Sequence, residues 1–142
     1  MAIFGFDDIA SIVNNCEAVL RKVTHMQAKE TISGSDLLSG ESLVVTCFEF
    51  DQCSFYFMCL GETDEIKITK TIPIGHWVSH DISHESPWGN VTGHELNNTW
   101  QLSNAKGYDD AVMLQFGNER GNTRLILEAV ASRFAVFGVN QN

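Results

Sequence analysis

The sequence is short of basic residues and of long apolar runs. Only 9 Lys and Arg stand against 18 Asp and Glu, which gives a formal net charge of −9. No stretch approaches the roughly 20 apolar residues that a membrane-spanning helix requires. The N-terminal segment Met1–Asp8 also lacks the basic stretch that opens a signal peptide. These absences predict a protein that binds neither nucleic acid nor membranes, and we expect it in the cytoplasm.

Motifs of catalysis and of cross-linking are missing as well. The four cysteines form no CxxC pair, and Cys47, Cys53 and Cys59 lie inside apolar, strand-like runs. We therefore expect buried free thiols rather than a disulfide framework. The chain contains no GxSxG, no HExxH and no glycine pattern of a nucleotide-binding loop. The prediction is a non-enzymatic protein without a cofactor.

What the chain does contain suits one packed domain over residues 1–142. Hydrophobic residues make up 44% of the sequence and charged residues 19%, and 9 Phe and 3 Trp stand beside only 2 Pro. A chain of 142 residues buries enough apolar surface to fold without disulfide bonds or a structural metal ion.

The apolar patterning predicts an α+β fold that is mainly an antiparallel β-sheet of about six to eight strands with one short N-terminal helix. The helix is expected over Phe6–Asn14, because Ile9, Ile12 and Val13 recur at helical spacing after two acidic residues. Residues 18–26 either continue this helix or form the first strand, and we favour the strand.

The clearest element is a hairpin formed by residues 42–50 and 53–60. Pairing Phe50 with Cys53 places Phe48 opposite Phe55 and puts every second side chain on one face. We expect that face to be buried. It consists of Phe48, Phe50, Cys53, Phe55, Phe57 and Cys59.

The rest of the chain predicts further strands around one long loop. Residues 65–74 form a half-buried strand with Ile66 and Ile68 on one face and Lys67 on the other. Residues 76–98 are interpreted as an ordered surface loop, and strands are expected at residues 99–102, 111–116, 123–130 and 134–139.

The acidic residues are unevenly distributed. Residues 30–66 carry eight acids and no Lys or Arg. Such a field attracts basic partners, although plain solubility also explains an acidic surface. The adjacent pairs Asp64-Glu65 and Asp109-Asp110 make poor carboxylate dyads, because neighbours on a strand point to opposite faces.

A histidine-rich stretch offers an alternative. His76, His80 and His84 are spaced by four residues, and on a helix they would form one stripe with Asp81 and His94 near enough to complete a metal site. The intervening residues are poor helix formers, so a surface loop without metal is the favoured interpretation.

One run of residues resembles a known family. It comprises Ser86-Pro87-Trp88, Gly93-His94-Glu95-Leu96, Trp100-Gln101-Leu102, Asn104 to Ala111, Leu114-Gln115-Phe116, and then Leu125-Ile126-Leu127, Ala129, Ala131-Ser132 and Phe134. The pattern is similar to that of a family of small bacterial proteins without an established activity, so it implies a fold and little more.

The physics of those residues predicts a structural corner. Trp88 and Trp100 would pin the long loop onto the sheet, and Tyr108 and Asp109 would hydrogen-bond back to the loop. A binding cleft between this corner and residues 84–96 is the alternative.

The leading functional hypothesis is an immunity or antitoxin-type inhibitor that occludes a basic toxin or nuclease domain. The alternatives are a small metal-dependent or hydrolytic enzyme that uses the His76–His94 loop, and a structural module that forms a homodimer. The residues expected to contact the partner are Glu49, Asp51, Glu62, Asp64, Glu65, Trp88, Tyr108, Asp109 and Asp110.

Overall fold

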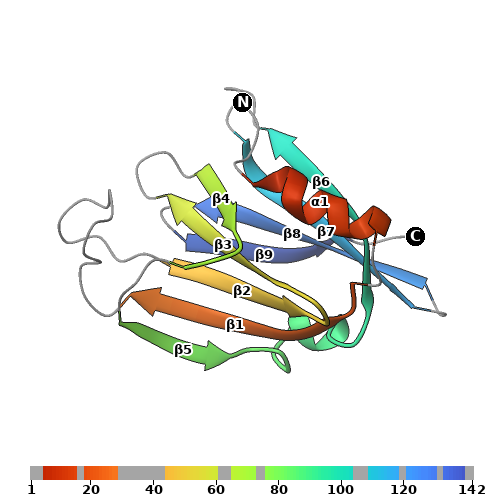
Figure 1. Ribbon diagram of the computed structural model, residues 1–142, viewed down its shortest axis with the longest axis horizontal. Coiled ribbons are helices and arrows are strands. Elements are labelled where there is room, and N and C mark those ends of the chain that lie inside the picture. Colours follow the sequence, from red (N-terminus) through yellow and green to blue (C-terminus); the bar gives the residue numbers. More distant parts are fainter. Residues whose placement is uncertain are drawn as a thin grey trace.

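The computed structural model describes residues 5–15, 18–28, 44–60, 65–72, 76–103, 109–118, 121–130 and 133–139. Within these ranges the chain forms one α-helix and nine strands in two antiparallel sheets (Figure 1). Sheet A has the order β4 (Glu65–Thr69), β3 (Ser54–Leu60), β2 (Val44–Phe50), β1 (Leu20–Ala28) and β5 (Trp77–Asp81). Sheet B has the order β6 (Glu95–Ser103), β7 (Asp109–Asn118), β8 (Gly121–Val130) and β9 (Arg133–Val139).

The predicted fold class is therefore confirmed, and residues 18–26 belong to a strand. The described strands exceed the predicted six to eight because Trp77–Asp81, which we expected to be part of a loop, forms β5. It pairs with β1 along one edge of sheet A. Four of its five residues are exposed, so it has no apolar pattern, and its extended form follows from the free edge that β1 offers.

Helix α1 (Phe6–Asn15) lies in the layer of sheet A, where it contacts β4 and covers β6 of sheet B (Figure 1). Asp7 and Asp8 occupy its first turn, where the helix dipole favours negative charge. Gly5, just before it, has a φ of +82°, and a Cβ there would lie 1.9 Å from the carbonyl oxygen of Ile68. Only glycine fits this position, so it sets the approach of the helix to β4.

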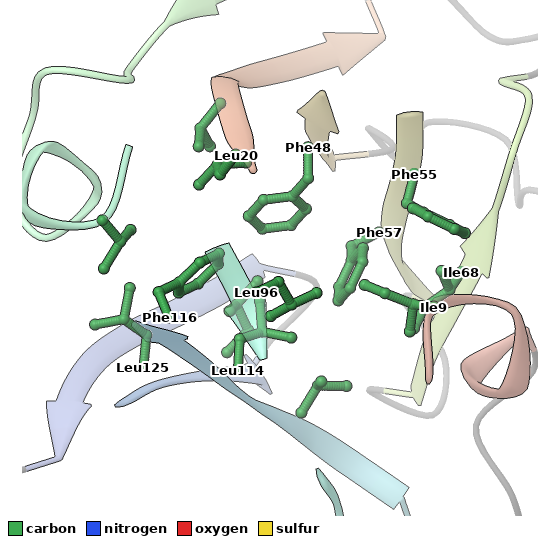
Figure 2. Packing of buried hydrophobic residues seen from close by; sticks show 14 of the residues in the cluster. Ile9, Leu20, Phe48, Phe55, Phe57, Ile68, Leu96, Leu114, Phe116 and Leu125 are labelled. Carbon is green, nitrogen blue, oxygen red and sulfur yellow. The ribbon is translucent and has the colours of Figure 1, made fainter. Parts of the chain in front are cut away.

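The main core fills the space between the two sheets. The predicted hairpin is confirmed, because Phe48 pairs with Phe55 across β2 and β3, and the expected face is buried. Phe48 makes an edge-to-face contact with Phe57 at a centroid distance of 4.8 Å. Figure 2 shows these rings meeting Leu96, Leu114 and Phe116 from sheet B. Ile9 of α1 closes the same cluster beside Ile68.

A smaller second cluster covers the outer face of sheet A. Val45 and Met58, which pair across β2 and β3, are 0% and 5% exposed although they point away from sheet B. Ile72, after β4, and Trp77, at the start of β5, pack against them. Cys47 shares this outer face and is a free thiol, and burial raises its pKa to about 11. Ile72 and Trp77 thus bury part of the outer face of sheet A.

Residues 82–94 connect the two sheets and are tied to β1. The Ser83 hydroxyl is buried and accepts a hydrogen bond of 2.9 Å from the backbone N–H of Val23. The Thr92 hydroxyl donates to the carbonyl oxygens of Ser83 and Trp88, at 3.0 and 2.9 Å. The short 3₁₀ turn Trp88–Asn90 places the Trp88 indole in the core. The loop is therefore ordered by hydrogen bonds, as we expected, but it is shorter than predicted because β5 occupies Trp77–Asp81 and β6 begins at Glu95.

Candidate protein-binding face

The outer face of sheet B carries a continuous apolar row. Trp100 pairs with Met113, Met113 pairs with Ile126, and Ile126 pairs with Phe137, so each strand contributes one side chain. These positions alternate with Leu114, Leu125 and Leu127, which point into the core. We call this row, consisting of Trp100, Met113, Ile126 and Phe137, the sheet B row.

The sheet B row is open to solvent. Phe137 is 44% exposed, and Val130 on the same face is 46% exposed, while the other three members of the row are half-buried. None of the described helices and strands packs over this face, because α1 contacts β6 from the side of sheet A. Contiguous exposed apolar surface with a polar border is typical of sites that bind another protein.

A chain of polar side chains borders the row and holds its tryptophan. Asn97 donates to Asn122 at 3.0 Å and accepts from the Gln115 amide at 2.6 Å. The Arg124 Nε donates to Gln115 at 2.8 Å, and the Arg124 guanidinium lies 5.0 Å from the centre of the Trp100 ring. A cation over an indole face is a favourable contact. These contacts hold the indole in one orientation, a property that preorganised binding residues share.

The predicted acidic face is divided by the structure. Asp51 lies in the β2–β3 turn, where its carboxylate pairs with the Arg21 guanidinium in two hydrogen bonds, one of them 3.2 Å long. The Arg21 side chain holds the pKa of Asp51 below its usual value. Glu49 is half-buried on the outer face of sheet A, with Lys22 as its neighbour in the β1–β2 register. Bases therefore accompany both of these acids.

The other predicted contact residues lie elsewhere. Glu65 opens β4 opposite Leu60, at the far end of β3 from Asp51, about 20 Å away at about 3.3 Å per strand residue. Glu62, Asp64 and Tyr108 lie outside the described residues. Asp109 and Asp110 begin β7, where the Asp109 backbone pairs with Ser103, and Asp110 is half-buried. The acids therefore do not form a single patch within the described chain.

The two tryptophans of the predicted corner have different roles. Trp88 is 3% exposed and stacks edge-to-face on Phe48 at 5.2 Å, so it does pin the loop onto the sheet. The predicted contact of Trp88 with a partner stays a prediction, and in this fold its indole lies inside the core. Trp100 does not hold the loop as predicted, since it belongs to the outer face of sheet B.

The histidine stripe does not form, since its residues occupy a strand and a turn rather than a helix. His80 is an exposed residue of β5, with His25 of β1 as its cross-strand partner, and His84 lies beyond the strand. The Asp81 carboxylate accepts a hydrogen bond from the backbone N–H of Ser83. Across the described ranges, no three His, Cys, Asp or Glu side chains are arranged to hold a metal ion.

A signal of the sheet B row was present in the sequence. The strands of sheet B contain uninterrupted apolar triplets, Val112-Met113-Leu114 and Leu125-Ile126-Leu127, where a half-buried strand would alternate. Triplets of this kind indicate that both faces of the sheet are apolar. Since only one face of sheet B packs against the core, the middle residues of the triplets, Met113 and Ile126, lie on the outer face.

The fold and this face define a small two-sheet antiparallel β-domain with one open apolar surface. None of the helices among the described residues is long and apolar enough to cross a membrane. The chain belongs to DUF6334, a family of unknown function whose model matches residues 6–142. The resemblance to a family without an established activity is thereby confirmed. Neither the curated proteins nor the solved structures include a significant match to this chain.

Proposed function

We propose that this chain is a non-enzymatic, cytoplasmic binding protein of the immunity or antitoxin kind, which occludes a basic toxin or nuclease domain. The observation that carries the proposal is the sheet B row. It combines an aromatic anchor at each end, Trp100 and Phe137, with a polar border, and interfaces concentrate their binding energy in such residues.

Net charge supports a basic partner over a second copy of this chain. At −9, two copies repel each other at long range, while a basic domain is attracted and its encounter is accelerated. The acids that surround the domain would therefore steer the partner, and the sheet B row would make the close contact. The acids would thus affect the association rate and the sheet B row the affinity of the complex, and separate variants can test the two effects.

The test begins with tagged protein as bait in lysate of its native host, at low and at moderate salt. A basic protein that binds at low salt is then purified, and its affinity is measured with wild type, Ile126→Arg and Val78→Ser. Ile126→Arg places a charge in the centre of the sheet B row, and we expect at least a hundredfold weaker binding. Val78 on sheet A is 42% exposed, close to the 44% of Phe137. Val78→Ser therefore serves as the control and should bind the partner with wild-type affinity.

Inhibition of the partner's toxic or nuclease activity by wild type, and not by Ile126→Arg, would support the proposal. Absence of a basic partner at both salt concentrations would overturn it. Light scattering adds another outcome: a stable homodimer that Ile126→Arg dissociates would assign the face to self-association and contradict the proposal.

The steering acids are tested by charge reversal at Glu62, Asp64 and Glu65 together. We expect a slower association rate at low salt and a smaller salt dependence, with an unchanged dissociation rate. An unchanged association rate would show that this acidic segment does not face the partner.

A further inference from the structure

A cleft of about 430 Å³ opens between the two sheets on the side away from α1. One wall is formed by β1 and β2 of sheet A, and the other by Phe134 and Val136 of β9, which lies behind sheet A in Figure 1. Ile82 and Trp88 also line the cleft. The volume lies within the range of sites that bind small molecules.

The wall of sheet A changes from apolar to polar where the core ends. Along one cross-strand row, Phe57 pairs with Thr46, Thr46 pairs with His25, and His25 pairs with His80. Phe57 belongs to the core, whereas Thr46 and His25 line the cleft together with Gln27. Hydrogen-bonding groups thus converge on one wall, and the opposite wall is apolar.

Thr46 is an unusual member of this wall. Its side chain is on the face that points into the cleft and is only 5% exposed, yet its hydroxyl makes no hydrogen bond within the described part of the chain. A buried hydroxyl without a hydrogen-bond partner is unfavourable, so most buried polar groups in proteins have a partner. A ligand in the cleft would satisfy it.

The lining also restricts the chemistry of the ligand. It contains no Asp, Glu, Lys or Arg among its described residues, so a permanently charged group would enter without a counter-charge. A space between two packed sheets is a slot, which suits a flat molecule. Aromatic and branched walls favour ring systems, and one polar wall favours a single hydrogen-bonding edge.

From these observations we propose that the inter-sheet cleft is a binding site for an uncharged, planar heteroaromatic molecule. The ring system lies against Phe134 and Val136, and its polar edge bonds to Thr46 and His25. This site is separate from the sheet B row, because Val136 and Phe137 are neighbours on β9 that point to opposite faces of sheet B.

The test is a titration of the full, ¹⁵N-labelled chain followed by NMR. Adenine, indole and lumichrome are the uncharged planar probes, and benzoate and tryptamine are charged comparators. We expect at least one uncharged probe to shift the amides of His25, Thr46 and Val136 saturably, with a Kd below 1 mM, a value on the order of that for weakly bound fragments. The charged comparators should bind at least tenfold more weakly.

Two variants and a control test the geometry. Thr46→Val removes the hydroxyl and keeps the shape, and it should weaken probe binding at least fivefold. Val136→Phe fills the slot and should abolish binding, while Phe137→Ala on the outer face should leave it unchanged. The spectra report folding of each variant directly.

Three results would overturn the proposal: no uncharged probe that binds below 1 mM, equal affinity of the charged comparators, or full affinity in folded Thr46→Val and Val136→Phe. Ile126→Arg, the variant that tests partner binding, lies on the outer face and does not line the cleft. Failure of this site and failure of the proposed inhibitor function therefore give different results.

Discussion

The outer faces of the two sheets carry similar apolar rows and have opposite environments. On sheet A, Val45 and Met58 are buried beneath Ile72 and Trp77. On sheet B, the row from Trp100 to Phe137 has no described element over it, and Phe137 is 44% exposed. A sheet with two apolar faces needs a cover on each, and the described part of the chain supplies a cover for the outer face of sheet A but none for that of sheet B. The uncovered face is therefore where a partner is expected.

The largest expected effect comes from two methionines that occupy matched positions on these faces. Met58→Ala leaves a cavity under the cover of sheet A and should lower the free energy of unfolding by about 2–5 kcal/mol. Met113→Ala removes a half-buried side chain of the sheet B row and should cost about 1 kcal/mol or less. Urea denaturation measures both. Equal losses of unfolding free energy in the two variants would show that the outer faces of the two sheets are equally buried.

The attachment of the inter-sheet loop is the next target. Ser83→Ala removes the hydroxyl that accepts the Val23 N–H and leaves a buried donor unpaired. We expect a loss of about 1–3 kcal/mol. Ser79→Ala, an exposed serine of β5, is the control and should change stability by less than about 0.5 kcal/mol. A loss no greater than that of the control would mean that the loop is held by its apolar contacts alone.

The polar border of the sheet B row predicts an effect on binding rather than on stability. Arg124→Lys keeps the charge and loses the Nε bond to Gln115 and the planar contact with Trp100. We expect roughly three- to tenfold weaker binding of the basic partner, because the indole is no longer held in place. Calorimetry gives the affinity, and the unfolding midpoint should stay within about 2 °C of wild type. Unchanged affinity would show that the network does not position Trp100 for binding.

The smallest effect concerns acid stability at the edge of sheet A. Hydrogen bonds from Ser83 lower the pKa of Asp81 below its ordinary value of 3.8. The carboxylate therefore stabilises the fold above that ordinary value, and its contribution is lost as the pH falls through the lower pKa of the folded state. Asp81→Asn should flatten the stability profile below about pH 4, and denaturation from pH 2 to 6 tests this. A profile as steep as that of wild type would exclude this role for Asp81.

Local patterns predicted much of the fold. The helix at residues 6–15, the assignment of residues 20–28 to a strand and the register of Phe48 with Phe55 follow from spacing, from helix-dipole rules and from the two-residue period of strands. Strand β5 was not predicted, because apolar and polar residues do not alternate in Trp77–Asp81. Its extended conformation depends on pairing with β1, whose residues lie about fifty positions earlier in the sequence.

The candidate site was harder to predict than the fold. Charge alone pointed to Glu49 and Asp51, but both acids lie near bases that come from β1. His25 and Thr46 carry no sequence signal of a site, because His25 is one of several polar residues of β1 and Thr46 is a single hydroxyl in the mainly apolar strand β2. They become partners in a cleft only when β1, β2 and β9 are brought together.

By itself, the sequence determined the helix, every described strand except β5, and which side chains of β2 and β3 face the main core, because spacing along the chain decides these properties. Only the tertiary structure decided that the strands divide into two sheets, that Ile72 and Trp77 cover one outer face, and that the row ending at Phe137 stays open. Covering a face requires contacts between residues far apart in sequence, and the apolar pattern of a strand is the same whether its cover comes from its own chain or from another protein.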